Sequence, residues 1–580
     1  MLERLRFRLA SAEALTQLAL LGVLCGLLAG GVIIAFRIVV EYLQSVILPG
    51  GGSENYEALT TMQRLIVPVL GGLLIGFAFQ LLKPQTRQLG VTHVMERLAY
   101  HQGYLPWRNA VAQFFGAAVS IASGHSVGRE GPSVHLGATN GSLLGQWLQL
   151  PNNSIRTLVA SGVAAAIAAS FNTPLAGVIF AMEVVLMEYT ITGFTPVILA
   201  AVSATALSRL VYGSAPAFVV PALSMGSIQE LPYILVMGLA IGGLAAAFIA
   251  LLHGFGGLIR ERPVWERAAL GGLLTGVCAV AVPQVMGIGY DTVNSAMLGE
   301  LGLWTMLAIV AAKLIATAAA IGLGLPGGLI GPTLVIGAAA GGAMGLIAGQ
   351  FMPGEVSSHG FYAMVGMGAM MGATLQAPLA ALIAMLELTA NPNILLPGML
   401  AVIAASLTSS EAFGRGPVFV MLMRVRGLDY RNDPISQSLR RLGVAGIMSR
   451  SFVTANRHLE SSKAQRLLDG TPMWIVVSDK DKPSALLPAA DLVRYLGEQE
   501  AEPTTADAVE IEVDLLGIPG RRRQLAPISL QATLQEAQEA LEHHGAEALY
   551  VMRATQPGSE HVYGVLTVQD IEAHYRSPSR

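Results

Sequence analysis

Long apolar runs, separated by short polar segments, make up residues 1–423. Between residues 301 and 354, for example, Lys313 is the only charged residue. A helix of about 20 residues crosses the ~30 Å hydrocarbon core of a bilayer, and runs such as 14–36 and 231–252 are long enough to do so. The pattern predicts an all-α, multi-pass membrane domain over residues 1–423.

Glycine and proline interrupt several of these runs. The interruptions lie at 124–132, 172–174, 322–332 and 376–378. A helix that is broken inside the bilayer persists only where protein or a water-filled cavity surrounds the break. The breaks therefore indicate where a transport site lies.

The chain changes character after the last apolar run. From about residue 441 charged residues become frequent, and β-branched runs at 473–478 and 548–552 predict short buried strands between amphipathic helices. Thr533 and Glu536 have the spacing of a capping box, which marks the start of one such helix. This part predicts an α/β domain outside the membrane.

Composition excludes several classes of protein. Charged residues are 13% of the chain and hydrophobic residues 53%, whereas soluble proteins carry about 25% charged residues. A wholly soluble chain or a disordered chain does not have this composition. The 65 glycines suit closely packed membrane helices, and a net charge of −3 gives no basic surface for nucleic acid.

Basic residues flank the membrane part at both ends. Arg4, Arg6 and Arg8 precede the first apolar run, which is too long for a cleavable signal peptide, and Arg424 and Arg426 follow the last one. Basic residues gather on the cytoplasmic side of a membrane. We therefore expect a cell-membrane protein (inner or plasma membrane) with both termini and the α/β domain in the cytoplasm.

The membrane part contains an internal repeat. The segment 124–138 (GHSVGREGPSVHLGA) resembles 324–338 (GLPGGLIGPTLVIGA), and the sequence Pro-Leu-Ala at 174–176 recurs at 378–380. Two matches at nearly the same offset indicate two homologous halves, each with a broken segment at the corresponding place. The halves extend over about 14–215 and 231–420.

Each broken segment contains a Gly-Pro pair, Gly131-Pro132 or Gly331-Pro332. Proline at a helix start leaves the free backbone N–H groups at the positive end of the helix dipole, and glycine lets an ion approach the backbone closely. One segment alone would suit a kink between packed helices. The repeated pair favours an anion site where two helix N-termini converge, as in secondary transporters and their channel relatives.

Glu130 lies immediately before Gly131-Pro132. A carboxylate inside a membrane site is costly and marks function. It can occupy the place of an anion and leave when protonated, which makes it a candidate gate and proton carrier. The alternative is an acidic residue that merely stabilises a helix N-terminus. Arg129 beside it either assists anion access or pairs locally.

Two further sets of titratable residues favour structural roles. Glu183 and Glu387 occupy equivalent places in the two halves, which favours a role in holding the N–H groups of a broken helix. His93, His125 and His135 are dispersed without metal-ligand spacing, so we predict structural or interfacial roles and no metal site.

These motifs are similar to those of the CLC family of chloride channels and chloride/proton exchangers. The segment 128–132 resembles the gating-glutamate motif of the family, with Gly128, Arg129, Glu130 and Gly131. The segment 328–332 resembles its second anion-binding motif, in which the backbone amides of Leu329 and Ile330 would face the ion, flanked by Gly328 and Gly331.

Two more stretches, 169–177 and 376–379, match the family, so that the resemblance covers about residues 15–423. It implies tilted helices in inverted repeats and a homodimer with one pore in each subunit. The implied partners are chloride, protons, the lipid bilayer and a second copy of the chain. No cofactor is required for transport.

Three positions depart from the family pattern. Leu89, followed by Gly90, stands where a serine hydroxyl is expected at the central ion, and Phe419 stands where a tyrosine is expected. Both predict a less polar central site. Val184 stands where many exchangers have a proton-relaying inner glutamate. These departures favour a passive channel, with a chloride/proton antiporter as the alternative.

The tail resembles a pair of CBS modules, expected over 441–497 and 525–576. A linker over 424–440 would join the first module to the membrane domain, and an acidic linker over 498–524 would join the two modules. CBS pairs serve either as nucleotide sensors or as dimerisation platforms.

In the second module, Thr567 and Asp570 match the residues that meet the phosphate and the ribose hydroxyls of a nucleotide. The first module retains Asp491 but has Pro488 where the hydroxyl belongs. The resemblance therefore implies an adenine nucleotide at one of the two sites at most.

The leading prediction is a non-enzymatic membrane protein that conducts chloride and similar monovalent anions, gated by Glu130 and regulated by its CBS pair. An intramembrane enzyme built on Ser126 or Ser133 with a histidine would need a third, orienting group. A nucleotide sensor that is merely anchored in the membrane would not need repeated broken helices.

Overall fold

The computed structural model describes residues 9, 15–51, 54–189, 191–215, 218, 223–258, 261–351, 357–428, 438–479, 482–501, 512–553 and 561–576. Arg4, Arg6 and Arg8 lie outside these residues, as do parts of both expected linkers. The chain forms two compact units. The helical unit comprises 18–146 and 155–431, and the second unit contains 432–580 together with 1–17 and 147–154.

The first half of the helical unit contains eight α-helices and one π-helical segment in the described residues: α2 (Leu15–Ile47), α3 (Thr61–Leu81), α4 (Gly90–Tyr100), α5 (Trp107–Ala122), α6 (Glu130–Trp147), α7 (Asn152–Phe171), α8 (Pro174–Phe180), η4 (Ala181–Leu186) and α9 (Ile191–Tyr212). Short 3₁₀ turns lie at η1 (Pro49–Gly51), η2 (Tyr56–Ala58) and η3 (Pro84–Arg87).

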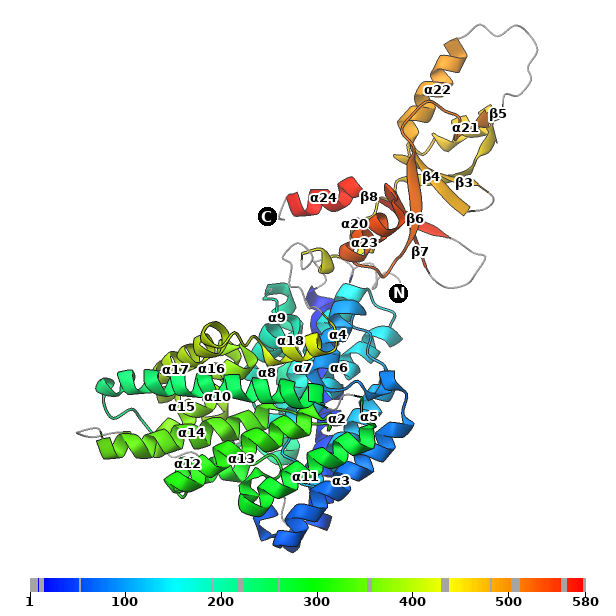
Figure 1. Cartoon of the computed structure of the whole chain (residues 1–580). Coiled ribbons are helices and arrows are strands. Elements are labelled where there is room, and N and C mark those ends of the chain that lie inside the picture. The colour runs from blue at the N-terminus through cyan, green and yellow to red at the C-terminus, as the bar shows by residue number, and fades with distance from the viewer. Residues whose placement is uncertain are drawn as a thin grey trace. The chain divides into compact units, whose positions relative to one another are not determined.

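The second half repeats this series and adds a last helix: α10 (Leu231–Leu258), α11 (Val264–Ala281), α12 (Tyr290–Leu298), α13 (Leu303–Gly322), α14 (Ile330–Phe351), α15 (His359–Leu375), α16 (Pro378–Thr389), α17 (Leu395–Leu407), η8 (Thr408–Ala412) and α18 (Val418–Val425). Its 3₁₀ turns are η5 (Ile228–Glu230), η6 (Pro283–Val285) and η7 (Pro392–Ile394). In this half, α13 packs against both α10 and α14 (Figure 1).

Within the described ranges, nine helices are long and apolar enough to cross a membrane. The shorter apolar segments 174–186 and 378–389 begin with proline at the first helical position, where its missing N–H costs nothing. The predicted membrane helices and broken helices are therefore both present.

Equivalent helices of the two halves pack against each other, α3 on α11 and α8 on α16. The closest approach of the first pair is symmetric. A Cβ added to Gly72 would lie 2.4 Å from the Ala268 carbonyl oxygen, and one added to Gly272 would lie 2.3 Å from that of Pro68. Small residues let membrane helices pack at this distance. A pseudo-twofold axis thus passes between the halves.

The second unit contains the strands β1 (Phe452–Asn456), β2 (His458–Glu460), β3 (Trp474–Asp479), β4 (Lys482–Pro488), β5 (Glu512–Asp514), β6 (Arg523–Ser529), β7 (Ala548–Met552) and β8 (Val562–Thr567). Its helices are α20 (Val444–Ile447), α21 (Ser461–Leu467), α22 (Ala489–Ala501), α23 (Leu534–His544) and α24 (Val568–Arg576). The predicted capping box of Thr533 and Glu536 starts α23.

Six strands form one sheet in the order β1-β3-β4-β6-β7-β8. Each half of the sheet has a parallel pair followed by an antiparallel pair, and β4 pairs with β6 to join the halves. Strand, helix, strand, strand and helix follow one another in each half. This repeated α/β arrangement fits a pair of CBS modules.

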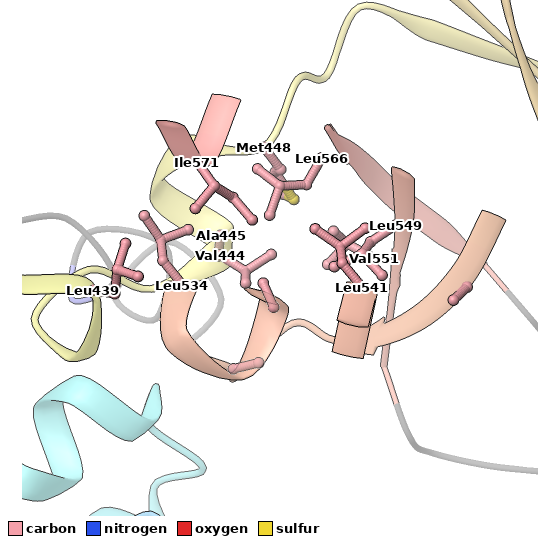
Figure 2. Close-up of a cluster of buried hydrophobic side chains, with 13 residues drawn as sticks. Leu439, Val444, Ala445, Met448, Leu534, Leu541, Leu549, Val551, Leu566 and Ile571 are labelled. Carbon is pink, nitrogen blue, oxygen red and sulfur yellow. The ribbon is translucent and has the colours of Figure 1, made fainter. Parts of the chain in front are cut away.

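The cores of the two modules do not follow the expected boundaries. Figure 2 shows Val444, Ala445 and Met448, which we expected in the first module, packed among Leu534 and Leu549 in the core of the second. An apolar face on so short a helix needs a neighbouring core to cover it.

The acidic segment expected as a linker is also partly structured. Strand β5 pairs with β2, and Val513, Leu515 and Ile518 are buried in the core of the first module. Residues 502–511 of this segment lie outside the described residues.

Candidate functional site

The two broken segments meet through their backbones. The N–H of Gly128 donates to the carbonyl of Gly328, and the N–H of Gly328 donates to the carbonyl of Gly128, both at 2.6 Å. Two residues later α6 begins at Glu130 and α14 begins at Ile330. The N-termini of two equivalent helices therefore start from one point at the interface of the halves.

The carboxylate of Glu130 is fully buried at this point. A Cβ added to Gly128 would lie 1.9 Å from its Oε2 atom, one added to Gly328 would lie 2.7 Å from Oε2, and one added to Gly331 would lie 2.8 Å from Oε1. Only glycine leaves room for the carboxylate at these three positions. A carboxyl group thus occupies the place at which both helix N-termini begin, where the dipoles favour an anion.

Tyr290, the first residue of α12, donates its hydroxyl hydrogen to Oε1 of Glu130 at 2.9 Å. Its ring packs edge-to-face on Phe218, with centroids 5.4 Å apart. Oε2 of Glu130 accepts no hydrogen bond from the residues that the structure describes. No sequence pattern pointed to Tyr290. The repeat has an offset of 200 residues, so Tyr290 at the start of α12 is equivalent to Gly90 at the start of α4.

Arg129 makes local contacts. Its Nη2 donates to the Ser170 carbonyl at 2.9 Å, and its guanidinium lies 5.3 Å from the ring centroids of both Phe171 and Tyr290. The same residue lines a cavity of about 450 Å³, whose other charged residues are Arg37, Glu41, Glu54 and Asp291. Arg129 thus combines local contacts with access to a cavity large enough for several water molecules.

A second cavity, of about 240 Å³, brings together predicted anion-binding residues from four separate segments: Leu89, Gly90, Gly131, Gly328, Leu329, Ile330 and Phe419. Thr92 and three basic residues, Arg87, Arg267 and Arg426, also line it. Leu89 and Phe419 line this cavity without contributing a hydroxyl group. Arg129 lines the first cavity and Gly131 lines the second, so the residues on the two sides of Glu130 in the sequence face different cavities.

Glu183 and Glu387 hold the N–H groups of broken helices, as predicted, but each does so in the other half. The carboxylate of Glu387 accepts from the amides of Leu175 and Ala176 at 3.1 and 2.7 Å. That of Glu183 accepts from the equivalent amides at 379 and 380, at 3.2 and 2.6 Å. The repeat predicted equivalent roles for the two carboxylates. That each one binds amides of the other half is known only from the structure.

Val184 is buried in the π-helical segment η4, which packs against α4. Helix α4 carries His93, whose Nδ1 lies 2.8 Å from Nε2 of His135 on α6. The sequence did not predict that these two histidines meet. His125 is separate and lies 2.9 Å from the Ser123 hydroxyl.

The serines that an intramembrane enzyme would use have other partners. Ser126 shares a hydrogen bond of 2.8 Å with Thr317, and the hydroxyl of Ser133 donates to the Arg129 carbonyl. Neither of these hydrogen bonds involves a histidine. The described contacts offer no support for a nucleophile and base at this place.

The predicted nucleotide residues lie at equivalent strand-to-helix junctions of the second unit. The backbone N–H and the hydroxyl of Thr567 both donate to Asp570, at 2.8 and 2.7 Å, between β8 and α24. Asp491 lies at the start of α22 after β4, 3.3 Å from Arg494. A Cβ added to Gly520 would lie 2.5 Å from Asp491.

Comparison with known proteins gives consistent matches. A family model described as voltage gated chloride channel matches residues 71–410. A ClcB-like protein of Ralstonia nicotianae is 37% identical over 388 residues, which are 66% of this chain and 90% of that protein.

Two solved structures have the same fold. A slow cyanobacterial Cl⁻/H⁺ antiporter has a TM-score of 0.61 and 22% identity, and the match covers 70% of this chain and 97% of that chain. A eukaryotic CLC transporter has a TM-score of 0.61 and 20% identity, and covers 97% of this chain and 99% of that chain. The second match extends over both units.

Proposed function

This chain belongs to the voltage-gated chloride channel family, and from that membership we propose that it carries chloride and similar monovalent anions across a cell membrane. The observation that carries this proposal is the position of Glu130. Its carboxylate lies at the common start of two helices, and its sequence neighbours Arg129 and Gly131 line two different cavities.

The proposed gate follows from electrostatics. The N-termini of α6 and α14 favour one negative charge at their common start. While Glu130 is charged and in place, its carboxylate is that charge and fills the path. Protonation removes this charge and therefore the attraction between the carboxylate and the two helix N-termini. An anion from either cavity can then take its place.

Tyr290 holds the gate in the closed form. A hydrogen bond to a carboxylate is stronger than one between neutral groups. The hydroxyl of Tyr290 therefore stabilises the charged Glu130 in its buried position. The guanidinium of Arg129 lies over the ring of Tyr290 and lines the larger cavity.

Further parts of the proposal rest on the family resemblance. We propose a homodimer with a pore in each subunit, with both termini and the CBS pair in the cytoplasm. The CBS pair would regulate transport, with an adenine nucleotide at Thr567 and Asp570. Val184 favours passive conduction, whereas another pair of residues, described below, favours exchange for protons.

The test is chloride flux from liposomes that contain the purified protein, measured from pH 4.5 to 7.5. We expect flux in the wild type to rise as pH falls, by up to about tenfold per pH unit, as for titration of one group. Glu130→Gln should remove this dependence, because its amide does not titrate. Glu300→Gln, a change at an exposed carboxylate that accepts from Ser295, is the control.

Two outcomes would contradict the proposal. The first is a folded wild-type protein that carries no anion. The second is a Glu130→Gln protein whose flux depends on pH as in the wild type.

A further inference from the structure

The His93–His135 pair has no place in the gate described above. His93 is the fourth residue of α4 and His135 is the sixth residue of α6. Their side chains are 1% and 0% exposed, and their rings stack with centroids 5.1 Å apart. Burial of two imidazoles costs free energy that their shared hydrogen bond offsets only in part, because the other ring nitrogen of His135 is unpaired in the described residues.

The nitrogen atoms of the pair form a chain with two outer ends. Nδ1 of His93 and Nε2 of His135 share one hydrogen bond. The outer nitrogen of His135, Nδ1, is buried and has no hydrogen-bond partner among the residues that the structure describes. A buried nitrogen without a partner is a place at which a proton or a water molecule can be exchanged.

The charged and titratable groups that act on His93 come from three segments. They are Arg97 on α4, His101 immediately after it, and Arg426 after α18. All of them are basic residues. Helix α6 contributes His135 itself, and η4, which packs against α4, contributes Val184 at the position expected for an inner carboxylate.

The pair lies next to the proposed anion path. Residues Gly90–Thr92 line the smaller cavity, and His93 follows them directly. At 1.5 Å per residue, His135 lies about 7.5 Å along α6 from Glu130. A proton that passes between the two side chains would need bridging groups or water molecules over this distance.

We propose that the His93–His135 pair is a proton relay that supplies Glu130, so that this protein exchanges anions for protons although Val184 occupies the inner position. This inference rests on the proposed function. It assigns a proton-carrying role to two residues that belong to neither the gate nor the anion-binding motifs.

The relay conserves protons at each step. A proton binds to Nε2 of His93, and the hydrogen on Nδ1 of His93 moves across the shared hydrogen bond to Nε2 of His135. The hydrogen on Nδ1 of His135 then leaves toward Glu130. One proton enters and one leaves, and both rings end as the other neutral tautomer. Rotation of the two rings restores the starting arrangement of their N–H groups, so that the next proton can pass in the same direction.

The experiment measures chloride flux and proton flux together in liposomes with a chloride gradient and a fixed voltage. We expect uphill proton movement in the wild type. His135→Gln and His93→Gln should each lower the proton flux about 100-fold, the size of a typical loss of general acid–base assistance, while chloride flux persists. His125→Gln, a change at a buried histidine outside the pair, should leave the coupling ratio unchanged.

The double variant tests whether the two residues act in series. Because either change already breaks the relay, His93→Gln with His135→Gln should lose no more proton flux than one change alone. Losses that multiply would overturn the relay. A loss of chloride and proton flux in equal proportion would also overturn it, because that result indicates a structural role.

The failures of the two proposals can be distinguished. Chloride flux without proton movement in the wild type would overturn the relay and leave the proposed anion transport intact. Absence of any anion flux in the folded wild type would overturn the proposed function, and the relay with it.

Discussion

The segments 128–132 and 328–332 have nearly the same backbone and opposite side-chain chemistry. Their glycines donate hydrogen bonds to each other at equal distances, and each segment starts a long helix two residues later. The first segment places Arg129 and Glu130 at the junction, whereas the second places Leu329 and Ile330 there. Two equivalent halves thus provide one charged wall and one apolar wall.

This difference separates two tasks. The symmetric backbone supplies two helix N-termini, and both are needed to favour an anion at one point. A single carboxylate is enough to fill that point, and a second one beside it would add like-charge repulsion. In the proposed function, the symmetric backbone suits the binding of the ion, and the asymmetric side chains suit the gate.

The α/β unit has the same division. Its two modules share the order of strands and helices, but only the second has a hydroxyl at the strand-to-helix junction. Thr567 of the second module corresponds to Pro488 of the first. A repeated fold again carries different side chains at equivalent positions of its two copies.

The largest effect is expected from alanine at the paired glycines. In Gly328→Ala the new Cβ would lie 2.6 Å from the backbone nitrogen of Gly131, which cannot move without separating the halves. In Gly128→Ala the nearest atom is the end of the Glu130 side chain, which can rotate away. Size-exclusion chromatography should show loss of folded protein for the first variant only.

The folded Gly128→Ala protein should also conduct chloride about tenfold faster at neutral pH, because a displaced Glu130 no longer fills the path. Folded, wild-type-like protein from Gly328→Ala would contradict the difference between the two positions.

A smaller and equal effect is expected from Glu183→Ala and Glu387→Ala. Each change leaves two amides of a helix start in the other half without their acceptor, at a cost of about 2 kcal/mol. Thermal unfolding in detergent should show similar decreases in Tm for the two variants. Glu300→Ala is the control, and a large decrease for only one of the pair would disprove the symmetric role.

Tyr290→Phe should affect transport without affecting stability greatly. The change removes the hydrogen bond that favours the charged Glu130, so the carboxylate is protonated more easily. The acid-dependent rise in chloride flux should move to higher pH by about one unit. Tyr233→Phe, which loses a hydrogen bond to the Met344 carbonyl instead, should leave the pH profile in place.

The smallest effect is expected in the α/β unit. If the second module binds an adenine nucleotide, Asp570→Ala should weaken ATP binding to the full-length protein about tenfold, the cost of one lost hydrogen bond to a charged group. Asp491→Ala should change it little. Isothermal titration calorimetry measures both, and equal losses would show that the two modules do not differ in this way.

The sequence predicted the membrane helices, the broken helices and the helix start at Gly131-Pro132, because each depends on local patterns. Apolar length indicates a membrane helix, and a Gly-Pro pair indicates a helix start, whatever surrounds them. The short-range rule of the capping box likewise located the start of α23.

Contacts between distant segments were not predictable in this way. Tyr290 reaches Glu130 across 160 residues, and His93 reaches His135 across 42. No local pattern specifies which helix faces shall meet. For the same reason Val444 was expected in the module that follows it in sequence, whereas it is buried in the other module.

The exchange of carboxylates between halves has a consequence for synthesis of the protein. The amides of Leu175 and Ala176 are made 212 and 211 residues before Glu387, their acceptor. At roughly 5–20 residues per second, a ribosome needs about 10–40 s to cover that interval. During this time the two amides at the start of α8 lack their carboxylate acceptor. Water or another acceptor must bind them until Glu387 is made. A nascent chain truncated between the halves would therefore remain incomplete and be a target for membrane quality control.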